Sequence, residues 1–186
     1  MAAGRSQRTR PGAASRPERL WLVRSPGGGF QLEGEGGWQL SAVRAPGGFR
    51  VQGSAIEGWL LRKDGPEDGG GFVLLRGSAP DASEASRATH LPGSETGSGC
   101  STILAGDGRL FRIVPRVGRV ARYDLLGWEG RGAYLLAQRL VDGWRITSAV
   151  AGREIALDVE VLVVFGAEIL DAEEPLVEVS EPGDRD

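Results

Sequence analysis

The sequence is short of the side chains on which most enzyme and metal chemistry depends, with one cysteine and one histidine in 186 residues. A single cysteine cannot form an intramolecular disulfide or supply the several thiolates of a structural zinc site. Ser–His–Asp and Cys–His mechanisms need an imidazole held beside the nucleophile. His90 precedes Cys100 in a polar stretch rich in serine and glycine, where we expect no such dyad. We therefore predict a protein that is not an enzyme and uses no cofactor and no metal.

Phosphate-binding and calcium-binding motifs are missing as well. The glycine runs at 27–29 and 69–71 lack the Gly-Lys-Ser/Thr ending and the following helix of a phosphate-binding loop. The acidic stretch at 64–71 is typical of a hairpin tip and does not have the alternating acids of a calcium loop. With 25 acidic residues, an unrecognised carboxylate pair is the one route to catalysis that stays open.

Long hydrophobic runs are absent. The most apolar stretch, 161–167, is far shorter than the ~20 residues of a membrane-spanning helix. Residues 20–23 are too few for the apolar region of a signal peptide. We predict a cytoplasmic protein without a transmembrane segment, and the lone cysteine is compatible with a reducing compartment. A formal net charge of −3 argues against general nucleic-acid binding, which normally requires a basic excess.

Glycine, in contrast, is abundant, with 30 residues that mostly separate short apolar segments. The Asp-Gly pairs at 64–65, 107–108 and 142–143 mark tight reversals, because both residues tolerate the positive φ that hairpin turns need. This rhythm predicts a mainly β fold in which an antiparallel meander forms a closed or nearly closed barrel. The expected strands lie within 20–23, 30–32, 38–43, 49–51, 59–61, 72–75, 102–104, 110–114, 120–126, 133–141 and 144–150.

We divide the chain into one β-rich domain with a tail at each end. The domain covers residues 19–175 and contains a polar loop at 78–101, whose Ser, Gly, Ala and Thr content is unsuited to the core. Residues 1–18 form a basic tail that we expect to be disordered, and residues 176–186 form an acidic tail.

The apolar C-terminal segment, residues 155–171, allows two conformations. Ile155–Val161 alternates like a strand, and the β-branched valines favour that reading. If Asp158 is an N-cap, the residues up to Leu170 form a helix that is apolar on nearly every side and must be buried. Gly166 weakens either element. We favour a buried helix, with a strand over its first part as the alternative.

Arginine is concentrated in residues 109–145, which carry eight arginines and three acids. Arg116 and Arg119 flank an expected turn at 117–118 and could project from one end of the sheet. Guanidinium groups suit phosphate and carboxylate recognition. Together with the buried C-terminal segment, they lead us to predict a β-barrel domain that binds an anionic lipid or an apolar ligand, or an acidic protein as partner. A merely solvated outer face is the alternative. The candidate anion-binding residues are Arg109, Arg112, Arg116, Arg119, Arg122 and Arg131.

Four tryptophans adjoin glycine-rich turns: Trp38, Trp59, Trp128 and Trp144. Aromatic residues in such places usually close the ends of a β core. Exposure on a ligand-binding or partner-binding surface is the alternative.

The order of the elements resembles the tubby-like superfamily, which includes LURP-one-related proteins and phospholipid scramblases. The hairpin rhythm of 108–114, 120–126 and 133–136 carries the resemblance, together with the apolar segment at 158–170. It covers roughly residues 20–172. The resemblance implies a closed barrel threaded by a hydrophobic C-terminal helix, and a non-enzymatic domain that associates with lipid or other anionic ligands. No binding residue of the family maps onto this chain. A protein-interaction or structural module that uses its charged ends is the alternative function.

Overall fold

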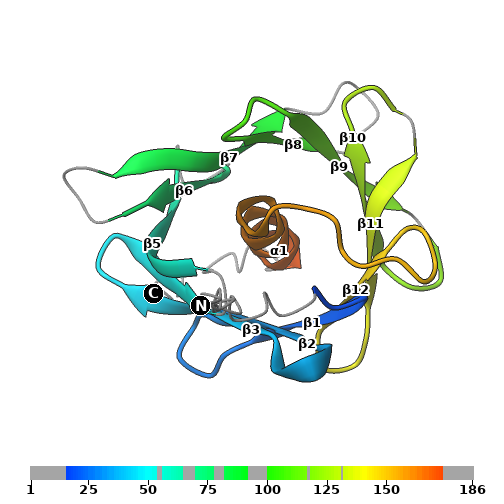
Figure 1. Cartoon of the computed structure of the whole chain (residues 1–186), viewed down its shortest axis with the longest axis horizontal. Helices are drawn as coiled ribbons and strands as arrows, with labels where there is room; N and C mark the ends of the chain where they lie inside the picture. The colour runs from blue at the N-terminus through cyan, green and yellow to red at the C-terminus, as the bar shows by residue number, and fades with distance from the viewer. Residues whose placement is uncertain are drawn as a thin grey trace, which may run out of the picture.

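The computed structural model describes residues 16–53, 56–64, 70–77, 82–91, 100–116, 118–130 and 132–173. These residues form twelve antiparallel strands that close into a barrel around one α-helix (Figure 1). The mainly β, closed-barrel prediction is therefore confirmed. The predictions for residues 1–15 and for the acidic tail at 176–186 fall outside the described residues.

Each strand pairs with its neighbours in the chain, and the last strand pairs with the first, which closes the ring. The strands are β1 (Arg19–Arg24), β2 (Phe30–Gly34), β3 (Gln39–Ala45), β4 (Gly48–Gly53), β5 (Ile56–Lys63), β6 (Phe72–Arg76), β7 (Ser83–Leu91), β8 (Cys100–Ala105), β9 (Leu110–Arg116), β10 (Arg122–Gly127), β11 (Ala133–Arg139) and β12 (Trp144–Ser148). A short 3-10 helix, η1 (Glu35–Gly37), precedes β3, and the α-helix is α1 (Val159–Glu173).

Alternation of side chains explains why these segments form the barrel wall. In β1, Leu20 and Leu22 are buried, whereas Trp21 between them is exposed. Leu22 pairs with Leu32 of β2, which in turn pairs with Leu40 of β3, so one interior row is leucine across three strands. Because side chains alternate between the two faces of a strand, this register places every second residue in the core.

The helix α1 runs through the centre of the barrel, and its residues from Val161 to Ala167 are all buried (Figure 1). The buried-helix prediction is confirmed, while the alternative of a strand over Ile155–Val161 is wrong. A helix satisfies its backbone hydrogen bonds internally, whereas a strand inside a closed barrel would find no free edge with which to pair. Gly166 lies against β1, where an added Cβ would come 3.3 Å from Leu22 Cδ1.

The polar-loop prediction for 78–101 is wrong for Ser83–Leu91 and for Cys100–Ser101, which lie in β7 and β8. The helix passes close to β6, β7 and β8, so the inward positions of β7 need small residues. Ala85 and Ala88 fill these positions and are buried. A strand with an inner face of alanine lacks the large apolar residues that reveal strands in a sequence.

The basic tail also ends earlier than we predicted, because Arg16 and Pro17 pack on the barrel. Pro17 is buried beside Gly34, and its carbonyl oxygen accepts a hydrogen bond from the Ile155 amide at 3.3 Å. An Arg16 guanidinium nitrogen donates to the carbonyl oxygen of Leu157. These contacts hold the start of the domain against the segment that leads into α1.

Candidate functional site

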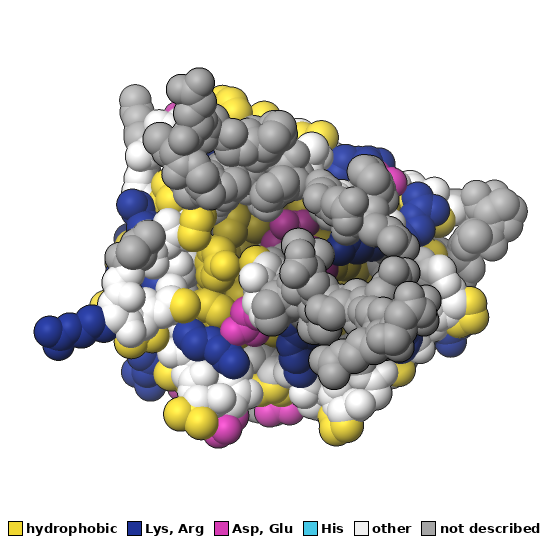
Figure 2. Space-filling model, turned by 180° about the vertical axis from the view of Figure 1, so that it is seen from behind, with side chains coloured by type: hydrophobic (Ala, Val, Ile, Leu, Met, Phe, Trp, Pro, Cys, Tyr) yellow, Lys and Arg dark blue, Asp and Glu magenta, His cyan; other side chains and the backbone are white. Residues whose placement is uncertain are grey.

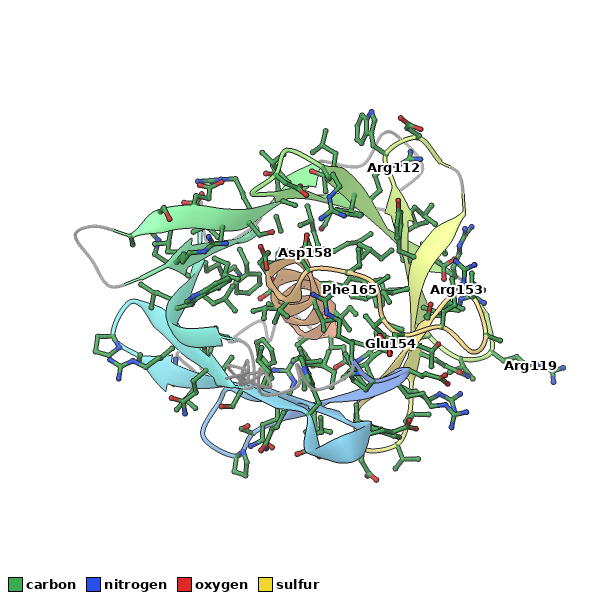
Figure 3. All side chains as sticks on the ribbon, viewed as in Figure 1. Arg112, Arg119, Arg153, Glu154, Asp158 and Phe165 are labelled. Carbon is green, nitrogen blue, oxygen red and sulfur yellow. The ribbon has the colours of Figure 1, made fainter. Side chains whose placement is uncertain are left out.

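The interior of the barrel is occupied by α1, whose Phe165 lies inside the ring of strands (Figure 3). Near the start of α1 there is a shallow apolar recess with about 220 Å³ of empty space, part of which is open solvent. Its lining residues are Arg16, Pro17, Leu20, Trp38, Ile155, Leu157, Val159 and Leu162. The recess is too small and too uniformly apolar to orient a polar substrate.

Charged residues attach both ends of α1 to the wall. At its start, Asp158 pairs with Arg109, and Glu160 lies 3.6 Å from Arg76. At its end, Asp171 pairs with Lys63 at 3.0 Å, and Glu173 Oε1 lies 2.8 Å from Arg139 Nε. Viewed from behind, the molecule shows Lys and Arg side chains around a hollow in which hydrophobic side chains are visible (Figure 2).

Strand β9 separates the predicted anion-binding arginines into two groups. Arg109 and Arg112 lie toward the end of the barrel where α1 begins, and Arg116, Arg119 and Arg122 lie toward the other end. Six residue steps along β9 correspond to about 20 Å. Figure 3 shows Arg112 and Arg119 far apart on the wall, with Arg119 pointing away from the barrel. Arg131 lies outside the described residues.

The most organised charged cluster surrounds Asp124 on the outer face of β10. Arg116 Nε donates to Asp124 Oδ2 at 2.8 Å, and Arg122 Nε donates to Oδ1 at 2.7 Å. Arg116 and Arg122 are cross-strand partners, so the register brings both to the same carboxylate. Asp124 is only 2% exposed, whereas both arginine side chains remain about half exposed. One acid thus fixes two guanidinium groups at the surface.

Burial alone would raise the pKa of Asp124, because it disfavours the charged carboxylate. The hydrogen bonds from Arg122 and Arg116 outweigh that effect, so the pKa of Asp124 lies below its ordinary value. The same contact raises the pKa of Arg122. The cluster is therefore ionised throughout the neutral range, with two positive charges against one negative charge.

Exposed aliphatic side chains lie on the turns beside this cluster. Val120 is exposed on the β9–β10 connection, and Leu140 and Val141 are exposed on the β11–β12 connection. The two connections are neighbours, since the Arg139 amide donates to the Ala121 carbonyl at 2.9 Å. Val141 is 94% exposed. We call this group the arginine edge: Arg116, Val120, Arg119, Arg122, Leu140 and Val141.

Several residues of this region were not among the predicted site residues. The role of Asp124 could not be predicted from the sequence, because a carboxylate in an arginine-rich strand resembles any surface acid until the strand register is known. Arg145 extends the outer row, and its Nη2 donates to Gln138 Oε1 at 2.8 Å. Val141 could have been found, because an aliphatic residue directly before the Asp142–Gly143 turn has no core to enter.

Some of the tryptophans close the β core, and at least one is exposed on the surface. Trp38 and Trp144 are buried, as expected for residues that close a β core, whereas Trp128 is 54% exposed on the outer wall. Trp144 packs against Tyr123, with ring centroids 5.3 Å apart. Burial, assisted by the negative charge of Glu173, raises the pKa of Tyr123.

Among the residues that the structure describes, there is no group of three or more His, Cys, Asp or Glu side chains placed to hold a metal ion. The described part of the chain also contains no helix that is both long and apolar enough to cross a membrane. Comparisons with protein-family models, curated proteins and solved structures gave no match to this chain.

Proposed function

We propose that this protein is a non-catalytic, tubby-like β-barrel domain that binds anionic lipid head groups at the arginine edge. The barrel threaded by a C-terminal helix supports the family assignment, since that arrangement is what the resemblance implies. The observation that carries the function is the cluster of Arg116 and Arg122 around the single buried carboxylate of Asp124.

The cluster has the chemistry of a phosphate site. Asp124 holds Arg116 through its Nε atom and Arg122 through its Nε and Nη2 atoms, which leaves both terminal nitrogens of Arg116 and one of Arg122 without a contact to Asp124. Guanidinium groups form paired hydrogen bonds with phosphate oxygens, and pre-orientation reduces the side-chain entropy lost on binding. Arg119 adds a third positive charge, and no ion pair joins it to a carboxylate among the described residues. The site therefore has a net attraction for anions.

The aliphatic part of the arginine edge favours a lipid over a soluble anion. Val120, Leu140 and Val141 stand beside the arginines and face solvent. A bilayer can accept such side chains in its interfacial region while the arginines contact the head groups. Each arginine near an anionic bilayer contributes about 1 kcal/mol. A free phosphate would use the arginines and leave the valines in water.

Vesicle co-sedimentation tests the proposal. Wild-type protein is mixed with phosphatidylcholine vesicles, with and without phosphatidylserine, and compared with the triple variant Arg116→Ala, Arg119→Ala, Arg122→Ala. We expect wild-type protein to bind only the anionic vesicles, more weakly as salt rises because the attraction is screened. The triple variant should bind roughly a hundredfold more weakly, since it loses about 1 kcal/mol per arginine and every 1.4 kcal/mol is a factor of ten.

The matched control removes three arginines from the opposite part of the wall: Arg44→Ala, Arg50→Ala, Arg62→Ala. These side chains are exposed on β3, β4 and β5, so the control has the same net charge as the test variant. Equal loss of binding in both variants would show a general charge effect and refute a site at the arginine edge. Absence of wild-type binding at low salt would refute the function altogether.

A further inference from the structure

A second surface lies at the other end of β9, and its chemistry differs from that of the arginine edge. Leu104 of β8 pairs directly with Leu110 of β9, and the Trp128 amide donates to the Leu110 carbonyl at 3.0 Å. The three side chains form one row across the outside of the barrel, and all are exposed. We call Leu104, Leu110, Trp128 and the adjoining Arg112 the tryptophan row.

Arg112 lies next to this row, two residues after Leu110 on β9. Its guanidinium carbon is 5.6 Å from the centroid of the Trp128 ring, and a Cβ added at Gly130 would be 3.7 Å from an Arg112 terminal nitrogen. The Nε atom of Arg112 is buried, and no hydrogen-bond partner is found for it among the described residues. The guanidinium thus lies over an indole face and near the Gly130 turn, and neither supplies a negative charge.

The lack of a negatively charged partner distinguishes Arg112 from the neighbouring arginines. Arg109 already pairs with Asp107 and Asp158, and Arg116 pairs with Asp124. Of the arginines on β9 and the preceding turn, Arg112 alone has no ion pair within the described residues. A guanidinium beside an exposed tryptophan combines two of the residue types that are enriched at interface hot spots, and the two leucines add apolar area around them.

We propose that the tryptophan row is a docking surface for an acidic segment of a partner protein, in which a carboxylate is flanked by apolar side chains. The carboxylate pairs with Arg112, and the apolar side chains cover Leu104, Leu110 and the Trp128 ring. Desolvation of the pair by the apolar flanks strengthens the contact relative to an open surface pair. This inference goes beyond the lipid-binding proposal and does not depend on it.

Charge and topology favour an acidic partner segment over an added strand, a second copy of the chain or a membrane. The barrel is closed, so it has no free strand edge to which a partner strand could add. Two copies of the chain that met through this row would place Arg112 against Arg112, which costs energy. A membrane bound at the arginine edge would contact the opposite end of β9, about 20 Å away.

The experiment measures fluorescence anisotropy of a labelled synthetic peptide in which leucine and glutamate alternate, and of the same peptide with lysine in place of glutamate. Trp128→Ala and Arg112→Met are compared with matched controls, Trp21→Ala and Arg50→Met. Trp21 and Arg50 are also exposed on the outer face. The methionine keeps the bulk of the arginine stem without its charge.

We expect wild-type protein to bind the glutamate peptide at least about tenfold more tightly than the lysine peptide, since one buried hot-spot pair is worth that much. Both test variants should weaken binding to a similar degree, and both controls should leave it unchanged. Binding that is absent in wild-type protein, or equal in wild type and Trp128→Ala, overturns the proposal. A loss of binding to anionic vesicles in Trp128→Ala also overturns it, because the row would then be a membrane contact.

Discussion

The two ends of strand β9 carry the same kind of residue and use it differently. At the end where α1 begins, Arg109 pairs with Asp107 and with Asp158, the residue directly before the helix. At the other end, Arg116 shares the buried carboxylate of Asp124 with Arg122. The first arrangement connects the wall to the helix. The second holds two positive charges in place on the outer surface.

The difference shows that the role of an arginine in this barrel follows from which carboxylate the strand register places beside it. Arg109 contacts Asp158, directly before the helix, so its charge is neutralised by the ion pair that attaches the start of the helix to the wall. Arg116 and Arg122 contact an acid from the wall itself, and two cations share one anion. Changes to the helix should therefore alter stability, whereas changes at the arginine edge should alter binding.

The largest expected effect comes from Phe165→Ala in the helix. Phe165 is fully buried inside the barrel, and its truncation leaves a cavity that the closed wall cannot collapse to fill. We expect a loss of about 3–5 kcal/mol in the free energy of unfolding, measured by guanidinium chloride denaturation. Vesicle binding by the fraction that remains folded should be unchanged. A parallel loss of binding would show that the helix and the arginine edge are not separate in function.

Asp124→Asn should have the next largest effect, because it alters both the stability of the fold and the binding of vesicles. The amide has the shape of the carboxylate but lacks the charge that Arg116 and Arg122 contact, so two charge-assisted hydrogen-bonding arrangements weaken. We expect the free energy of unfolding to fall by about 1.5–3 kcal/mol at neutral pH. Vesicle binding should also weaken, because the guanidinium groups are no longer held, even though the net charge becomes more positive.

The pH dependence of this effect has a defined sign. The pKa of Asp124 is lowered in the folded protein, so its stabilising contribution is fully present above the unfolded-state pKa of about 4. It is lost as the pH falls through the lower, folded-state value. The difference in unfolding free energy between wild type and Asp124→Asn should therefore be constant near neutrality and shrink below about pH 4. A difference that grew in acid would contradict an ionised Asp124.

How much of this could be predicted depends on where the physical signal lies in the chain. The closed barrel followed from local patterns, because large inward residues recur at every second position of β1, β2 and β9 and glycine marks the turns. Strand β7 was missed because its inward residues, Ala85 and Ala88, are small where the helix passes close by. That requirement comes from the tertiary structure and leaves no hydrophobic pattern.

The helix and the arginine edge also differ in how far local sequence patterns predict them. Val159–Leu170 was predicted as a buried helix because it is apolar on nearly every side, although its valines also fit a strand. The grouping of Arg116 with Arg119 was predicted from the turn expected between them. The partnership of both β-strand arginines with Asp124 required the β9–β10 register, which no local pattern specifies.

A smaller effect on stability is expected for Arg109→Ala. The variant removes the ion pairs with Asp107 and Asp158 and the contact of the guanidinium with the Phe111 ring, whose centroid is 5.6 Å away. Because these groups are partly exposed, we expect a loss of only about 0.5–1 kcal/mol in the free energy of unfolding. Vesicle binding should not change. A clear loss of vesicle binding would mean that the lipid contact extends to both ends of β9.

The smallest effect on stability is expected for Arg119→Ala. This variant is therefore the sharpest test of the difference between the two ends of β9. Arg119 points away from the barrel (Figure 3), so its removal should change the free energy of unfolding by less than about 0.5 kcal/mol. Its charge still lies beside the Asp124 cluster, and its loss should weaken binding to anionic vesicles about fivefold, as expected for one arginine near a charged bilayer. Arg109→Ala and Arg119→Ala remove the same charge from opposite ends of β9. If the two variants lower vesicle binding equally, binding depends on net charge alone, and the distinction between the two ends fails.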